Sequence, residues 1–300
     1  NPKHLTMMRR LSGSLSFVSD ASLTIDAPDI RTLALKVSGD PLDPATSATF
    51  IKPAELVDAI ELSPLNRSEL ILYNQLIAHA WNTIGPGKVY SVSKARLRGS
   101  HESNDRLHES FDRLMGAFAK VKVRDAETGS TKTVRINLLG PNAEEEGDAG
   151  FFHYTLHPSL LEVLKCSRSW ARLRSEIQYL LRSKYSIRLY EMIEQRINMR
   201  RQSETFAVQD LRGHLGVPKG KLKRFADFNA QCLKPAIGEV NQLTDFEVSA
   251  GLKKCGRRVD GIVITWLKKC PEARAQAAEE RERSRVGRVA RRKATVEVVL

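Results

Sequence analysis

Basic and amide side chains gather on one side of residues 221–243, the segment whose chemistry is easiest to specify. Drawn as a helix, the segment places apolar side chains within about 180° of one another. They are Phe225, Phe228, Cys232, Leu233, Ala236, Ile237, Val240 and Leu243. The opposite side carries Lys223, Arg224, Asp227, Gln231 and Lys234. Arg and Lys can bind guanine acceptors and an amide can bind adenine, so this side predicts base contacts in a DNA major groove. An ordinary solvated face is the alternative.

Other cations are placed to bind phosphates rather than bases. Lys219 and Lys221 come just before the helix, where positive charge suits the DNA backbone. Residues 253–258 form a basic turn between two expected strands, with Lys253, Lys254, Arg257 and Arg258 as phosphate candidates. In the first half, the candidates for backbone contact are Lys94, Arg96 and Arg98, for which ordinary surface exposure is the alternative.

The positive charge of the chain is concentrated in one region. The 300 residues carry a formal charge of +13, but residues 1–167 have a net charge of −1. Residues 168–269 have a net charge of +11, and residues 270–300 have +3. Charge spread for solubility would be more even, so the clustering favours a surface that displaces counterions from phosphates.

The sequence lacks the motifs that several kinds of catalytic and metal-binding site require. Gly220-Lys221 has neither the glycine spacing nor the following Ser or Thr of a phosphate-binding loop. No H-x-H pair is present, and His153 and His157 are expected to be structural rather than metal ligands. We therefore expect no enzyme activity, no metal and no cofactor.

No apolar run reaches the roughly 18 residues of a membrane span. Four cysteines without C-x-x-C spacing indicate a reducing compartment, and we expect a cytoplasmic, bacterial protein.

Helical and strand periodicities predict an α+β protein with two similar halves. The first half reads as helices over residues 63–81, 93–98, 104–118 and 158–164 and strands at 89–92, 121–123, 134–136 and 151–156. The second reads as helices over 177–199, 209–215 and 221–243 and strands at 206–208, 246–248 and 259–266. Three helices followed by a hairpin is the order of a winged helix, a helix-turn-helix variant, so the fold class is tandem winged-helix domains with β-hairpin wings.

The domain boundaries follow from the same patterns. Residues 1–60 are rich in Ser, Thr, Asp and Pro and are expected to form an arm with little regular structure, short strands at most. The two winged-helix domains are expected over 61–167 and 168–269. Residues 270–300 form a tail of Ala, Glu and Arg that reads as a solvated helix or a disordered end, with a DNA-engaging arm as the alternative. The chain begins with Asn, so its true start is left open.

An ordered set of motifs in the second half resembles the iteron-binding plasmid replication initiators. The motifs are residues 183–191 (SKYSIRLYE), 210–216 (DLRGHLG), 225–228 (FADF), 233–237 (LKPAI), 239–241 (EVN), and Lys253-Lys254 with Gly256-Arg257. The resemblance is clear over 168–269 and rests on element order over 60–167. One departure is Asn229-Ala230-Gln231, where other members often carry an Arg cluster.

The resemblance implies both a site and a set of partners. Residues Lys223, Arg224, Asp227, Asn229 and Gln231 would read bases from the third helix of the second domain, and the basic wing would hold phosphates. The first domain would contact the backbone and supply dimerisation. Monomers would bind repeats in origin DNA and start replication, and dimers would repress the initiator's own gene. A host initiator and a replicative helicase would be recruited.

Three alternatives to an initiator remain. A winged-helix transcriptional repressor without origin function would use the same DNA-binding residues, so only the arrangement of its sites would separate the two. A DNA-processing enzyme would cleave DNA in the presence of a divalent metal. A protein of the membrane surface would need an amphipathic helix with a cleaner apolar face.

Overall fold

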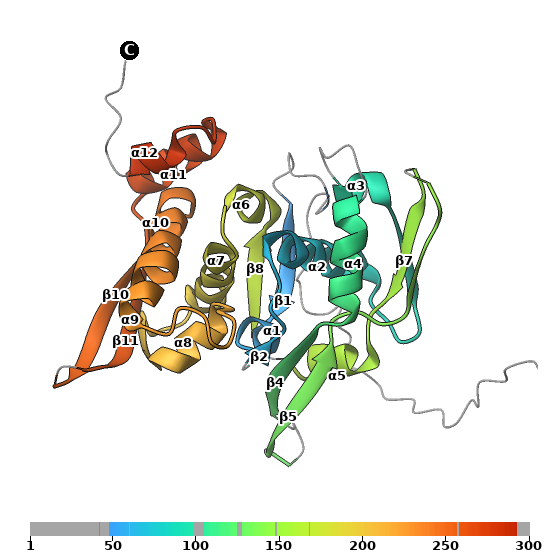
Figure 1. Ribbon diagram of the computed structural model, residues 1–300, viewed down its shortest axis with the longest axis horizontal. Helices are drawn as coiled ribbons and strands as arrows, with labels where there is room; N and C mark the ends of the chain where they lie inside the picture. The colour runs from blue at the N-terminus through green and yellow to red at the C-terminus, as the bar shows by residue number, and fades with distance from the viewer. Residues whose placement is uncertain are drawn as a thin grey trace, which may run out of the picture. The chain divides into compact units, whose positions relative to one another are not determined.

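The computed structural model describes residues 42, 48–59, 61–98, 105–124, 128–147, 149–167, 169–256 and 258–292 (Figure 1). These residues all belong to one compact unit. Most of the expected arm, residues 1–60, lies outside the described residues, as does the chain after residue 292. Within the described part, each helix is too short or too polar to cross a membrane.

The first half contains short helices and two small antiparallel sheets, β2-β4-β5 and β3-β7-β6, and its strand β1 pairs with β8 of the second half. Its helices are α1 (Ala54–Val57), α2 (Arg67–Ala80), the 3₁₀ turn η1 (Trp81–Thr83), α3 (Lys94–Arg98), α4 (Asp105–Met115) and α5 (Pro158–Cys166). Its strands are β1 (Thr49–Pro53), β2 (Glu61–Leu62), β3 (Val89–Ser93), β4 (Phe118–Arg124), β5 (Thr131–Asn137), β6 (Asn142–Glu144) and β7 (Phe151–Thr155). One hydrophobic core, which includes Leu76, Phe111 and Phe152, packs α2 and α4 against these sheets.

The second half repeats the order of helix, strand, helix, helix and hairpin. It contains β8 (Trp170–Arg174), α6 (Ser175–Leu180), α7 (Lys184–Arg196), β9 (Ser203–Ala207), α8 (Val208–His214) and α9 (Phe225–Phe228). These are followed by the π-helical turn η2 (Asn229–Leu233), α10 (Lys234–Leu243), β10 (Phe246–Cys255), β11 (Arg258–Lys268), α11 (Pro271–Glu282) and α12 (Arg288–Arg292). The strands β10, β11 and β9 form an antiparallel sheet in that order.

Strand β1 is a short strand within the region that was expected to form an arm with little regular structure up to residue 60. It pairs antiparallel with β8, Phe50 opposite Leu173, and both Phe50 and Ile51 are 1% exposed. Thr49, Phe50 and Ile51 are strand-forming residues, but Lys52 and Pro53 end this short run. The partner strand lies more than a hundred residues later in the sequence, so the pairing itself has no local signal.

Two predicted helices have different limits. Helix α2 starts at Arg67 rather than near Ser63 because Asn66 and Glu69 form a reciprocal capping box, with Asn66 Oδ1 accepting from the Glu69 amide at 3.1 Å. Ser63 instead accepts a hydrogen bond from the Phe118 amide. The single helix expected over 177–199 is two helices, because the chain is extended at Leu181 and Ser183 then caps α7.

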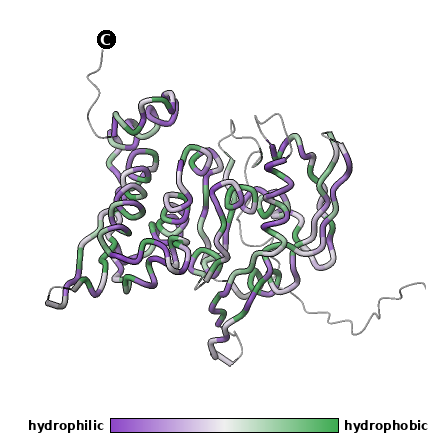
Figure 2. The backbone as a smooth tube through the Cα atoms, viewed as in Figure 1, coloured by the Kyte–Doolittle hydropathy of each residue, from purple (hydrophilic) through white to green (hydrophobic). Residues whose placement is uncertain are grey.

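The hairpin that closes the first domain is not the one that the sequence indicated. In the second domain β9 pairs with β11, the second strand of the wing. The corresponding partner of β3 is β7, which pairs with β6 to form a hairpin whose turn holds Glu145 and Glu146. The predicted hairpin β4–β5 exists, in the register Val121 opposite Val134, but it forms a separate sheet with β2. Purple and green segments alternate along this hairpin in Figure 2.

The tail after the second wing begins with two packed helices rather than a fully solvated one. Ala277 of α11 is buried, and so is Arg288 of α12. Arg281 donates to the Leu243 carbonyl at 3.0 Å, and Gln242 donates to the Arg288 carbonyl at 3.2 Å. Helices α11 and α12 therefore pack against the C-terminal end of α10, as Figure 1 shows.

A buried cluster of three charges joins elements from both halves. Glu191 of α7 lies 2.8 Å from Lys52 of β1 and 3.0 Å from Arg188, and the three side chains are at most 3% exposed. Asn74 of α2 also donates to Glu191. Arg188 donates further to the carbonyls of Val57 and His214, at the ends of α1 and α8. Burial by itself would raise the pKa of Glu191, but the charges of Lys52 and Arg188 outweigh it and keep that pKa below its ordinary value.

We predict that Glu191→Gln lowers the free energy of unfolding by about 3–5 kcal/mol, because it leaves two buried cations without a counter-charge. Urea unfolding followed by circular dichroism measures the change. Since the folded pKa is lowered, the contribution of Glu191 is complete above about pH 4.3, its unfolded value, and is lost as the pH falls through the folded value.

The matched control for this prediction is Glu109→Gln. Glu109 is a 69% exposed carboxylate 3.7 Å from Arg113 on the same helix, and its loss should cost less than about 1 kcal/mol. Equal small losses in the two variants would show that the buried cluster contributes no more than a surface ion pair.

Candidate nucleic-acid interface

The third helix of the second domain has one buried side and one polar side. Phe228, Cys232 and Leu233 are at most 1% exposed, as are Ala236, Val240 and Leu243. On the other side Gln231 and Lys234 are exposed, and Asp227 and Asn229 are partly exposed. The amphipathic division expected from the sequence is therefore present, and the polar side does not pack against protein.

The helix contains a π-helical turn just before its proline. The turn covers Asn229–Leu233, and α10 then runs through Pro235 to Leu243 without a break. A proline ring clashes with the carbonyl four residues earlier, here that of Gln231, and cannot donate to it. Widening the preceding turn accommodates the ring. Pro235 therefore neither ends the helix nor leaves its preceding turn regular.

The helix starts at Phe225, so the expectation that it covers residues 221–224 is wrong. Those residues form a turn in which Gly220 and Leu222 have positive φ angles of 83° and 51°. A left-handed conformation costs a leucine about 1–2 kcal/mol, so other contacts must hold the turn in place. Lys221, Lys223 and Arg224 belong to this turn, and their side chains are exposed.

Arg212 of α8 provides those contacts. Its guanidinium, which is largely buried, donates to the carbonyls of Lys221, Leu222, Lys223 and Arg224. It also lies 4.7 Å from the centre of the Phe228 ring, the first fully buried side chain of the helix. One side chain therefore fixes both the turn that presents the cations and the start of the helix.

Four of the exposed cations at this end of the domain have no counter-charge within the part of the chain that the structure describes. Within the described residues, no carboxylate pairs with Lys221, Lys223, Arg224 or Lys234. Lys219 is exposed as well. Uncompensated cations beside exposed amides are the pattern that recognition of a DNA groove requires.

The wing of the second domain extends beyond the same end of the helix. Strands β10 and β11 pair over ten positions, with a register shift between Lys253 and Lys254. Both lysines are exposed. Arg257 lies outside the described residues, and the side chain of Arg258 is not described. Figure 1 shows the wing tip and α9 at one end of this domain and α11 and α12 at the other.

The expected phosphate contact at Lys94 is contradicted by its burial. Lys94 is 1% exposed, and its ammonium donates to the Glu145 carbonyl at 2.6 Å. The first turn of the short helix α3 directs this side chain into the domain, beneath the β6–β7 turn. Arg96 is exposed and Arg98 is half-buried, so the structure does not bring the three side chains together on one surface.

A cationic surface on the β4–β5 hairpin was not assigned from the sequence. Lys120, Lys122 and Arg124 lie on one face of β4, and Arg135 lies opposite Lys120 on β5. Lys122, Arg124 and Arg135 are exposed, and none of the four pairs with a carboxylate within the described residues. The signal was the alternation of basic and apolar residues along the strand, which was interpreted only as strand period.

Both domains have the element order of a winged helix. The second domain also has unpaired cations at the start of its third helix and a basic wing. Together these features define a tandem winged-helix DNA-binding protein. Residues 49–194 match the family model described as Initiator Replication protein, WH1. Residues 207–266 match the model described as Initiator Rep protein, WH2. The chain belongs to this family of replication initiators, which confirms the resemblance expected from its motifs. The N-terminal match begins within the expected arm and extends through most of α7, and the exact domain boundaries remain predictions.

Comparison with solved structures is consistent with this fold. The crystal structure of Pi initiator protein in complex with iteron DNA matches with a TM-score of 0.52 and 16% identity, covering 74% of this chain and 97% of that one. A structure of domains 2 and 3 of RctB matches with a TM-score of 0.40 and 13% identity, over 75% of this chain and 88% of that one, which is too distant to support an argument. No curated protein matches the chain.

We predict that Arg212→Ala loosens the turn before the helix. Loss of several charge-assisted hydrogen bonds, each worth about 1.5–3 kcal/mol, should speed exchange of the Val217 and Lys221 amides at least tenfold. Those amides donate to the carbonyls of Arg212 and Pro218 in the structure. Hydrogen–deuterium exchange with mass spectrometry measures the effect.

Two further variants test the role of Arg212. Arg212→Lys keeps the positive charge but loses the planar guanidinium with its several donors. It should therefore restore only part of the protection of these amides from exchange. Arg201→Ala removes an exposed arginine bound to Glu204 and should leave these amides unchanged. Wild-type exchange rates in Arg212→Ala would show that the turn is held without this side chain.

Proposed function

We propose that this initiator binds repeated sequences, or iterons, in the double-stranded origin DNA of a plasmid and so starts replication. The observation that carries the proposal is the exposed, uncompensated set of cations and amides at the start of the third helix of the second domain. Family membership supports the origin function, and the relative named Pi initiator protein was solved with iteron DNA.

The helix start would supply base contacts in the major groove. Arg224 immediately precedes α9 and is exposed, and Gln231 and Lys234 are exposed further along. Lys223, Asp227 and Asn229 are the remaining candidates for base contacts. Arg and Lys suit guanine, whereas the two amides suit adenine. Asp227 would accept from a cytosine amino group and would disfavour a phosphate.

Two separate surfaces would hold the DNA backbone. Lys253 and Lys254 of the β10–β11 wing, with Lys219 and Lys221 before the helix, would bind phosphates around the recognised groove. In the first domain the exposed cations of β4 and β5 replace the buried Lys94 as the best candidates. The β6–β7 turn, which holds Glu145 and Glu146, would repel phosphates.

The remaining expectations from the sequence are part of the same proposal. The protein would act by binding alone, without catalysis, because its sequence has neither a phosphate-binding loop nor an H-x-H pair. It would work in the bacterial cytoplasm as monomers in equilibrium with homodimers. Dimers would repress the initiator's own gene, and a host initiator and a replicative helicase would be recruited to the opened origin.

We predict that DNase footprinting on the replicon that encodes this chain will show protection of tandem direct repeats. Two DNA-binding domains of different character on one chain suit an asymmetric repeat, because each domain can contact its own part of the site. Protection confined to a single inverted repeat upstream of a gene would instead identify a transcriptional repressor without origin function.

We predict that Arg224→Ala weakens binding to the specific site by about 1–3 kcal/mol and relaxes the preference at one base pair. The reason is the loss of a guanidinium that can donate to two guanine acceptors. Competition binding against a set of singly substituted sites, at fixed salt concentration, measures both effects.

Lys254→Ala is the matched comparison, since it removes one exposed cation from the wing. It should weaken binding to all sequences alike and reduce the dependence of log affinity on log salt by about one unit. If Arg224→Ala behaved in this way and left base preference intact, Arg224 would be a phosphate contact.

A further inference from the structure

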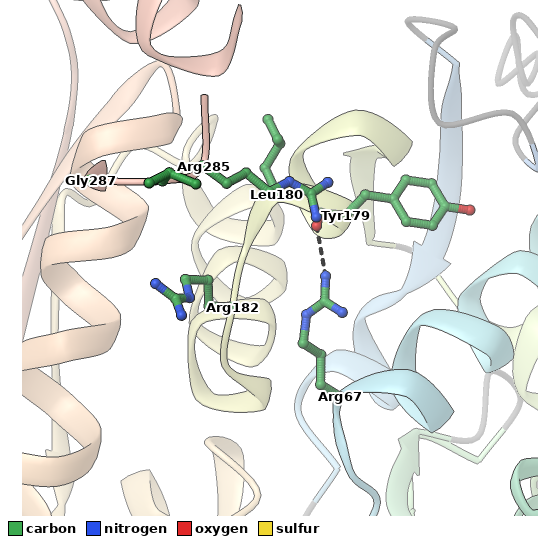
Figure 3. Close-up of a pocket in the computed structure, with 7 residues that line it drawn as sticks. Arg67, Tyr179, Leu180, Arg182, Arg285 and Gly287 are labelled. Carbon is green, nitrogen blue, oxygen red and sulfur yellow. Dashed lines mark hydrogen bonds between the residues drawn. The ribbon is translucent and has the colours of Figure 1, made fainter. Parts of the chain in front are cut away.

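A cavity of about 450 Å³ lies between three segments that are distant in the sequence (Figure 3). Its lining comes from the start of α2, from the end of α6 with the link to α7, and from the loop between α11 and α12. The first two segments fall within the N-terminal family match, whereas the loop lies beyond residue 266, where the C-terminal match ends.

Three arginines line this cavity. Arg67 is anchored, because its Nε and one Nη donate to the carbonyls of Leu181 and Tyr179, both at 2.6 Å. Arg182 and Arg285 are exposed, and within the described residues neither donates a hydrogen bond or pairs with a carboxylate. Two guanidiniums therefore keep their full set of donors beside a third that is fixed.

The charge of Arg67 is influenced by one neighbouring cation and one neighbouring carboxylate. Burial lowers the pKa of Arg67, the nearby charge of Arg285 lowers it further, and Glu239 of α10 opposes both. Glu239 is thus the carboxylate whose charge acts on Arg67, against the charge of Arg285. Like charges held close together are unfavourable unless an anion joins them.

The loop that carries Arg285 is held in place by other arginines. Arg291 donates to the carbonyls of Ser284 and Val286 at 2.8 and 3.1 Å. Arg288 donates to the Arg283 carbonyl at 3.1 Å and, like Arg291, binds the Glu280 carboxylate. Gly287 completes the loop with a φ of 75°. Because the loop backbone is tied down on both sides, Arg285 stays at the rim of the cavity.

We propose that this cavity is a binding site for a small phosphate-bearing compound of up to nucleotide size. The planar guanidinium matches phosphate oxygens with two parallel hydrogen bonds, and three such groups line this cavity. The volume lies within the range of about 300–1,000 Å³ that ligand sites occupy. The site is separate from the DNA-binding surface and uses none of its residues. A bound phosphate would join the first domain, the α6–α7 link and the C-terminal helices.

The test is isothermal titration calorimetry of the full chain with inorganic phosphate and with ATP, at constant ionic strength set with NaCl. We expect saturable binding at one site. The double variant Arg182→Gln/Arg285→Gln should bind at least tenfold more weakly. Its unliganded melting temperature should match the wild type, because both side chains are exposed and unpaired.

Two control variants separate this site from other cations. Arg283→Gln lies in the same loop but pairs with Glu279, outside the cavity, and should bind as the wild type does. Lys223→Gln/Arg224→Gln removes cations of the DNA-binding surface and should also leave phosphate binding unchanged. Undiminished binding by the Arg182/Arg285 variant would overturn the proposal, as would equal weakening by either control.

Origin DNA binding, measured on the same samples, keeps this inference distinct from the proposed function. If the Arg182/Arg285 variant lost DNA binding and the wild type bound no free phosphate, the cluster would be a DNA contact and the proposal would be wrong. If the wild type bound phosphate but not origin DNA, only the proposed function would fail.

Discussion

Glu191 is the charge on which the arrangement of the two halves depends. It is fully buried, and it compensates two cations, one from the first strand of the described chain and one from its own helix. Arg188, held by Glu191, then satisfies carbonyls at the ends of α1 and α8. Since buried charges are tolerated only when paired, this cluster specifies one docking of α7 against its neighbours and disfavours others that would separate the charges.

The surface proposed for DNA depends on a second interaction, which also lies at the C-terminal end of α8. Arg212 uses a single guanidinium to order four consecutive carbonyls, and the side chains of that turn are thereby directed away from the domain. The cations on the turn can repel one another without disordering it, because its backbone is held from inside. The loop between α11 and α12 is built in the same way. Arg288 and Arg291 bind its backbone, and the side chain of Arg285 remains exposed.

The sequence predicted those parts of the fold that have a local signal. The apolar stripe from Phe228 to Leu243, the β4–β5 pairing and the basic turn at Lys253 all follow from periodicity or local charge. The burial of Lys94 and the hydrogen bonds from Arg212 to the turn at residues 221–224 could not be predicted in this way. Both depend on carbonyls that only folding brings close. Strand β1 was not located within the arm for the same reason, since its partner lies over a hundred residues away. The start of the third helix was placed too early because the left-handed backbone at Leu222 leaves no mark in the pattern of apolar and polar residues.

The π-helical turn has a consequence for comparing this protein with its relatives. Such a turn is equivalent to inserting one residue into an α-helix, which rotates everything before it by about 100° relative to everything after it. A sequence alignment without a gap between this helix and a regular α-helix would therefore match Arg224 with a residue on a different side of that helix. Equivalent residues on the two sides of Asn229–Leu233 therefore have to be identified from superposed backbones. An apparent change of base-contacting residues there can reflect the rotation of the helix rather than a substitution.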